Sequence, residues 1–233
     1  MNPTIVLQLL SVLALTSAAI ARSLTVHQSR ATRQLTIALV TFAASQLLRL
    51  FAYNVSDWYS LVELAANLTW AVAACALLKH VLIAGRNTRW LWCINRARIA
   101  SLCLLVFTYA ASTAPYTLSD AMPVGLPTDP WMVAHWLVLL TFSTICIVLL
   151  TRAVFVSLEG ACPVERATLL AWFAAAVVGV CGVVSTLSVS VTPAEHWRST
   201  WALTSVATTL IAVGALIISY YRVRTPARQL TKV

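Results

Sequence analysis

The chain has 233 residues, of which 60% are hydrophobic and only 10% are charged. A soluble domain is ordinarily about 45–50% apolar and about 25% charged, so this composition excludes an ordinary soluble protein and favours an integral membrane protein. The formal net charge of +9 does not indicate a nucleic-acid partner, because the basic residues lie in short stretches between long apolar runs, where they act as topology signals.

The apolar residues form runs of roughly 20 residues or more, long enough to cross a bilayer as α-helices. They lack the ten-residue alternation that is typical of strands in a membrane barrel. We therefore predict an all-α polytopic membrane protein with a single seven-helix transmembrane domain covering residues 1–233. The predicted spans are residues 3–21, 34–54, 58–83, 98–117, 131–155, 168–192 and 197–221.

The first predicted span, "PTIVLQLLSVLALTSAAIA", has two interpretations. It is similar to a secretory signal, since "AIA" before Arg22 has the pattern of a cleavage site. However, no basic residue precedes the apolar stretch, and cleavage would leave Arg22, Arg30 and Arg33 outside the cell. We expect this segment to be retained as a helix.

The second and third spans each contain one full charge, Arg49 and Glu63. The turn between the spans is only a few residues long, which makes them antiparallel neighbours. Each charge lies five residues from this turn, and therefore about 7–8 Å below the outer interface. Because an isolated charge at a helix centre costs about 2.5–3.5 kcal/mol to insert, we predict that Arg49 and Glu63 form a direct ion pair.

Further polar residues extend this pair along both helices. Ser45 and Arg49 lie one turn apart on the second span with Gln46 beside them, and Glu63 and Asn67 lie one turn apart on the third. This spacing predicts a polar seam between the two helices. Two roles remain open for the seam: a structural ion pair with hydrogen-bonding helpers that fixes the packing, or a ligand or ion site that opens to the outer face.

The connection after the third span, "AGRNTRWLWCINRARI" (residues 84–99), alternates basic and aromatic residues. One interpretation is a short amphipathic element that lies in the membrane interface and binds anionic lipid headgroups. The other is a plain loop whose charges and tryptophans hold the topology. Either way, we expect the bilayer and its anionic headgroups at the inner face to be partners of this protein.

The basic residues predict the orientation of the chain. Short loops rich in Lys and Arg remain in the cytoplasm. Of the 16 Lys and Arg residues, 14 fall on one side of the predicted spans: Arg22, Arg30, Arg33, Lys79, Arg86, Arg89, Arg96, Arg98, Arg152, Arg166, Arg222, Arg224, Arg228 and Lys232. We therefore predict a multi-pass protein of the bacterial inner (plasma) membrane, with its N-terminus outside and its C-terminus in the cytoplasm.

Spans 1–3 and 5–7 have the same predicted orientation, with the fourth span between them. Parallel three-helix repeats joined by a linker helix occur in transporter folds. However, positive-inside charges and interfacial tryptophans produce similar internal matches in any seven-span protein. Whether the two halves are a true repeat stays open on the sequence alone.

The sequence contains no recognisable catalytic or cofactor-binding pattern. There is no HExxH, no nucleotide-binding loop and no lysine in the last span for a retinal. The two cysteines of the inner loops, Cys93 and Cys162, show no metal-ligand spacing. His135 is the one histidine well inside a predicted span, which excludes a pair of facing histidines for a haem. We predict no enzymatic activity, no cofactor and no metal site.

Two stretches, "YNVSDWYSLVELAANLTWAVAACALLKHVL" and "ERATLLAWFAAAVVGVCGVVSTL", together with the Ala-, Thr-, Val-, Arg- and Trp-rich composition, carry a family resemblance. They resemble the seven-helix membrane region of a large actinobacterial family described as transporters. The resemblance implies the seven-helix fold. Members of that family commonly continue into a cytoplasmic domain, which has no counterpart in these 233 residues, and no site residues follow from the resemblance.

Two functions are compatible with these patterns. The first is a non-enzymatic membrane sensor or interaction protein that acts through its basic inner surface on an unidentified protein partner or small ligand. The alternative is a small transporter whose polar site lies between spans 2 and 3, at Arg49, Glu63, Asn67, Gln46 and Ser45.

Overall fold

The computed structural model describes residues 3–24, 29–54, 59–85, 88–112, 129–189 and 197–224. In this part of the chain the elements are helices, and the seven α-helices are all long and apolar enough to cross a membrane, which confirms the predicted all-α class and the predicted number of membrane-length helices. The elements are α1 (Pro3–Ser23), α2 (Arg30–Asn54), α3 (Tyr59–Ala84), the 3-10 turn η3 (Thr88–Trp90), α4 (Leu91–Ala111), α5 (Pro130–Leu158), α6 (Pro163–Val189) and α7 (Trp197–Arg224).

Several helices begin earlier than the predicted spans. α2 begins at Arg30, α4 at Leu91 and α6 at Pro163, because a helix continues into polar residues where hydropathy no longer marks it. Most of the predicted loop element at residues 84–99 is therefore η3 and the first turns of α4. Residues 113–128, which include the predicted end of the fourth span, lie outside the described residues.

Local capping explains where two of the helices begin. Asp129 precedes α5, and its side-chain oxygen accepts a hydrogen bond of 2.8 Å from the backbone N–H of Trp131, with Pro130 at the first helical position. In α6, Pro163 is again first, and the Glu165 carboxylate accepts a bond of 3.1 Å from the backbone N–H of Cys162. These caps satisfy backbone donors that have no partner inside the helix.

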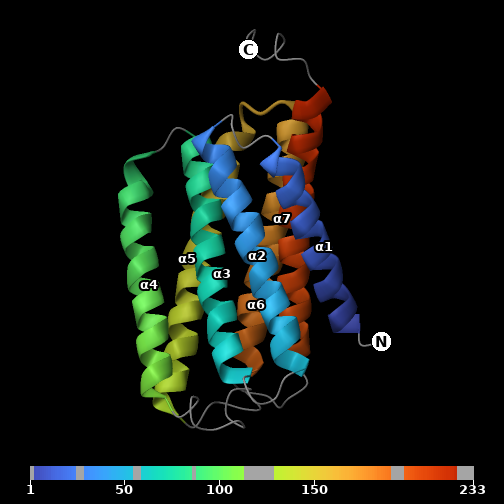
Figure 1. Cartoon of the computed structure of the whole chain (residues 1–233). Helices are drawn as coiled ribbons and strands as arrows, with labels where there is room; N and C mark the ends of the chain where they lie inside the picture. The colour runs from blue at the N-terminus through green and yellow to red at the C-terminus, as the bar shows by residue number, and fades with distance from the viewer. Residues whose placement is uncertain are drawn as a thin grey trace.

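Successive helices run in opposite directions and form a ring (Figure 1). Six of them close the ring in the order α1, α2, α3, α5, α6 and α7, with α7 returning to α1, while α4 lies outside against α3 and α5. The most extensive contact in the described part of the chain is between α2 and α3, followed by that between α6 and α7. The predicted side-by-side packing of the second and third spans is therefore confirmed.

The two ends of the bundle differ in charge. α1, α3 and α5 finish at the end where α2, α4 and α6 begin, and we call this the basic end (Figure 1). Its basic residues with described side chains are Arg22, Arg30, Arg33, Lys79, Arg89, Arg96, Arg98, Arg152 and Arg166, and α7 ends there at Arg224. This segregation is the arrangement that the positive-inside pattern predicts.

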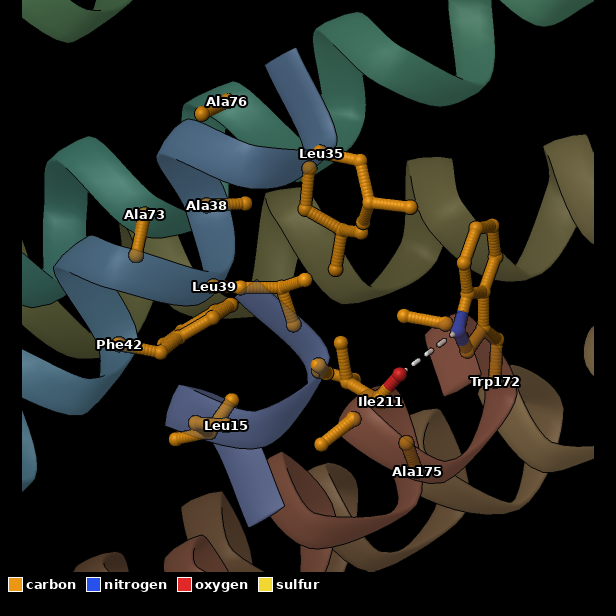
Figure 2. Packing of buried hydrophobic residues seen from close by; sticks show 14 of the residues in the cluster. Leu15, Leu35, Ala38, Leu39, Phe42, Ala73, Ala76, Trp172, Ala175 and Ile211 are labelled. Carbon is orange, nitrogen blue, oxygen red and sulfur yellow. Dashed lines mark hydrogen bonds between the residues drawn. The ribbon is translucent and has the colours of Figure 1, made fainter. Parts of the chain in front are cut away.

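An apolar core fills the middle of the ring (Figure 2). Leu15, Leu35 and Leu39 are completely buried there, and Phe42 and Ile211 nearly so. Small side chains on several helices let the backbones approach closely, which matters in lipid because packing, rather than removal from water, holds the helices together. These small core residues are Ala18, Ala38, Ala43, Ala73, Ala76, Ala175, Ala212 and Ala215.

The closest approach of α6 and α7 depends on Gly214. The Trp172 indole N–H donates to the Ile211 carbonyl at 3.2 Å across the two helices (Figure 2). A Cβ at position 214 would lie 2.6 Å from Trp172 Nε1 and 3.2 Å from the Thr168 carbonyl oxygen. The Gly214→Ala variant should therefore lose roughly 1–3 kcal/mol of unfolding free energy, measured in detergent, because the buried indole must move.

Gly182→Ala is the matched control for this prediction. A Cβ there would meet only Leu203 Cβ, at an ordinary 3.8 Å. Because alanine is also about 1 kcal/mol better than glycine within a helix, this variant should be as stable as the parent or more stable. Equal stability of the two variants would contradict the close contact at Gly214.

Candidate functional site

A chain of hydrogen bonds crosses four helices in the half of the bundle opposite the basic end. Arg49 Nη2 on α2 donates to Asn67 Oδ1 on α3 at 3.4 Å. Asn67 Nδ2 lies 3.3 Å from His135 Nε2 on α5. His135 Nδ1 lies 3.0 Å from the Leu105 carbonyl oxygen and 3.3 Å from Thr108 Oγ1, both on α4. We call Arg49, Asn67, His135 and Thr108 the polar network.

The hydrogen bonds of the polar network can all be donated in the same direction, from Arg49 through Asn67 and His135 to the Leu105 carbonyl. The Leu105 carbonyl can only accept, so His135 Nδ1 carries the proton that it donates there. In the neutral imidazole, Nε2 then accepts from the Asn67 amide, whose oxygen in turn accepts from Arg49. All three side chains are buried, so a disturbance at any one of them leaves a neighbour without its partner.

The Arg49 guanidinium is also held by an aromatic face. Its Cζ lies 5.4 Å from the centroid of the Trp70 ring, within the range of a cation–π contact. Trp70 follows Asn67 by about one turn on α3 and makes an edge contact with Phe42 of the apolar core, at 4.9 Å between ring centroids. The guanidinium is therefore held against α3, at the side of the apolar core that faces away from the basic end.

Glu63 does not take the place that the sequence predicts for it. Among the described side chains, no hydrogen bond or ion pair joins Arg49 to Glu63, so the predicted direct pair is wrong. The reason is that the Arg49 guanidinium donates to Asn67 and stacks on Trp70 instead. Asn67 lies four residues, or about 6 Å, beyond Glu63 along α3. Glu63 is nevertheless buried, one turn before Asn67 on the same helix.

Each of these two charged groups retains one buried atom without a hydrogen-bond partner within the described part of the chain. These atoms are Arg49 Nε, a donor, and Glu63 Oε2, an acceptor. Leaving a buried polar group unpaired costs about 1–3 kcal/mol, and more for a charged one. A donor and an acceptor of this kind on neighbouring helices are suited to a small polar molecule that carries both an acceptor and a donor.

The other two predicted seam residues, Ser45 and Gln46, face different partners. The Ser45 hydroxyl donates to the Ala66 carbonyl on α3 at 2.8 Å and pins α2 to α3. Gln46 Nε2 instead contacts Thr208 Oγ1 on α7 at 3.5 Å, and Thr208 is 2.7 Å from Ser11 Oγ on α1. The seam therefore extends past the α2–α3 interface to α1 and α7.

His135, Ser11 and Thr208 belong to this polar region, although no pattern in the sequence placed them there. His135 stood out as the one histidine well inside a predicted span, but only as evidence against a haem. Ser11 and the buried Gln8 lie about one turn apart on an apolar helix, which is a signal of a buried polar face. Ser11 bonds to Thr208 on α7, 197 residues further along the chain, and this partner could not be deduced from spacing.

The apolar core lies between this polar region and the basic end. Leu15 follows Ser11 by one turn on α1, Phe42 precedes Gln46 by one turn on α2, and Ile211 follows Thr208 on α7 (Figure 2). These core residues close the polar region on its basic side. Within the described residues, no group of three or more His, Cys, Asp or Glu side chains is placed to hold a metal ion.

Comparisons with models of protein families, with curated proteins and with solved structures found no match for this chain. The resemblance to an actinobacterial family therefore stays a prediction.

Proposed function

We propose that this protein is a non-enzymatic membrane sensor that binds a small polar ligand beside Arg49, Glu63 and Asn67. The observation that supports the proposal is the pair of oppositely charged, buried side chains with one unpartnered atom each. A ligand carrying an acceptor and a donor satisfies both atoms. Ionisable residues buried in a membrane bundle commonly mark ligand or ion sites.

The polar network provides a route by which binding changes the bundle. Arg49 is joined through Asn67 to His135, and His135 to two groups on α4. A ligand that draws Arg49 away from Asn67 frees the Asn67 amide to rotate and removes the partner of His135. The packing of α3 against α4 and α5 then depends on whether the site is occupied.

We further propose that the basic end faces the cytoplasm of a bacterial cell and that the N-terminus is outside. The support is the segregation of basic residues at one end of the bundle. In this orientation the ligand enters from outside, and the basic end is available to anionic lipids or to a protein partner.

Cysteine labelling tests this orientation. In a variant without the native cysteines, cysteines introduced at positions 117–130 should react with a membrane-impermeant reagent in intact cells, and cysteines introduced at positions 86–96 should react only after the membrane is opened. The physical reason is the positive-inside rule for short basic loops. The reverse labelling pattern would overturn the orientation.

A small transporter is the second candidate function, and the order of the helices favours it. α1, α2 and α3 pack around the ring in the same sequence as α5, α6 and α7, while α4 lies outside the ring, as a linker between two parallel three-helix repeats would. In this interpretation, the apolar core between Ser11 and Gln46 and the basic end is a closed gate that blocks the path of the compound. Uptake of the bound compound into vesicles that contain the purified protein would distinguish transport from sensing.

A thermal-shift screen tests the proposed ligand site. We expect at least one compound in a panel of small zwitterions, amines and carboxylates to raise the unfolding temperature of the parent. The shift should vanish in the double variant Arg49→Met/Glu63→Met, which removes both unpartnered groups together. The control is Arg33→Gln/Glu159→Gln, which removes one exposed charge of each sign elsewhere. A shift that survives in the first double variant would contradict the site.

A further inference from the structure

A groove lies on the side of the bundle where α4 joins it. Its volume is about 410 Å³, within the range of small-molecule sites. The buried side chains of Cys75, Leu78, Phe142 and Cys146 form its floor, and exposed residues of α4 and α5 form its rims. The lining is almost entirely apolar, so water is a poor occupant.

The groove exists because α4 presents small side chains to its neighbours. Ala97, Ala100 and Ser101 face the groove, at spacings that place them on one side of α4. α4 meets α5 at the end opposite the basic end and leans away from the bundle towards the basic end (Figure 1). The groove therefore runs towards the residues at the start of α4.

Two cations lie beside the groove towards the basic end. Lys79 follows the floor residue Cys75 by one turn, and Arg98 lies between the lining residues Ala97 and Ser101. Lys79 and Arg98 are close enough for their positive charges to act on each other and on the Cys75 thiol. Arg98 Nε is buried and has no hydrogen-bond partner within the described part of the chain.

Neighbouring cations next to an apolar groove match a molecule that combines an anionic group with a long apolar chain. An interfacial aromatic residue lies nearby, where Arg96 stacks over the Trp92 ring with its Cζ 3.7 Å from the ring centroid. A free inorganic anion would leave the groove unfilled, and an uncharged lipid would leave Lys79 and Arg98 without a countercharge.

We propose that this groove is a binding site for an anionic phospholipid, with one acyl chain between α4 and α5 and the phosphate against Lys79 and Arg98. The site is separate from the polar network, and it stands whether the protein is a sensor or a transporter. An acyl chain in the groove fills the space between α4 and the ring, so occupancy fixes the position of α4. Selectivity comes from the charges, because any lipid tail packs equally well against apolar side chains.

The test compares phosphatidylglycerol with phosphatidylcholine of the same acyl chains, added to the purified protein in detergent and counted by native mass spectrometry. Each basic residue near a membrane surface supplies about a five-fold preference for anionic lipid. The parent should therefore bind phosphatidylglycerol more than ten-fold better, and Lys79→Gln/Arg98→Gln should lose most of this preference. The control Arg33→Gln/Arg166→Gln removes two exposed basic residues of the same end and should keep it.

A second variant tests the groove independently of the charges. Ala97→Leu/Ala100→Leu enlarges two exposed side chains of the rim, so the protein should fold, and binding of both lipids should fall. Equal binding of the two lipids by the parent, an equal loss of preference in the control variant, or unchanged binding after the groove is filled would each overturn the proposal. Competition by glycerol 1-phosphate as strong as that by phosphatidylglycerol would also overturn it, because it would indicate a free-anion site.

Discussion

The Arg49→Met variant should lose about 3–5 kcal/mol of unfolding free energy, measured by denaturant unfolding in detergent micelles. The substitution removes the hydrogen bond to Asn67 and the contact with Trp70, and it leaves Glu63 buried without a countercharge. Removing one of two opposite buried charges on neighbouring helices is strongly destabilising, even where they form no direct bond, because the remaining charge stays desolvated.

Removing both charges together is the control for this prediction. Arg49→Met/Glu63→Met should recover most of the loss, since well-packed apolar residues often replace buried charges at little cost. Exchanging the two charges should recover less, because the hydrogen bond from Arg49 to Asn67 and the contact of Arg49 with Trp70 are both lost. A single Arg49→Met variant as stable as the parent would show that these charges do not interact.

A large loss of unfolding free energy is also expected when Asn67, the centre of the polar network, is replaced. Asn67→Leu preserves the size of the side chain but leaves Arg49 Nη2 and His135 Nε2 without their partners. Because each unpaired buried group costs about 1–3 kcal/mol, we expect a loss of roughly 2–4 kcal/mol in unfolding free energy. Nitrogen NMR of the His135 ring should at the same time show that Nε2 no longer accepts a hydrogen bond.

Thr69→Val on the same helix is the matched control for Asn67→Leu. The Thr69 hydroxyl bonds only to carbonyls of its own helix, those of Ala65 and Ala66. Its removal should change the unfolding free energy by no more than about 0.5 kcal/mol. If both variants cost the same, the polar network would not be a stabilising unit.

The number of helices and the neighbourhood of α2 and α3 could be predicted because both depend on local features. The length of an apolar run determines whether it can span the membrane. A connection as short as the one after Asn54 makes the two helices that it joins pack side by side. The starts of α2, α4 and α6 were predicted too late, since the helices continue into polar residues such as Arg30 and Asn95. Hydropathy marks the membrane and not the end of the helix.

The site could be predicted only in part, for a similar reason. Helical rise places Arg49 and Glu63 at matching depth, but it cannot decide whether the long guanidinium turns to Glu63 or to Asn67 one turn away. The contribution of His135 depends on α5 packing against α3 across more than 60 residues of chain. The same long-range packing creates the groove beside α4, which no local pattern indicates.

We propose that Arg49 Nε and Glu63 Oε2 are the contact atoms of a ligand site. A high-resolution structure of the protein purified from its native membrane in lipid tests this most directly. We expect density larger than a water molecule within about 3.2 Å of both atoms, with Arg49 still bonded to Asn67 or displaced towards the ligand. A direct Arg49–Glu63 ion pair with nothing between the two side chains, or a single water molecule there, would contradict the claim.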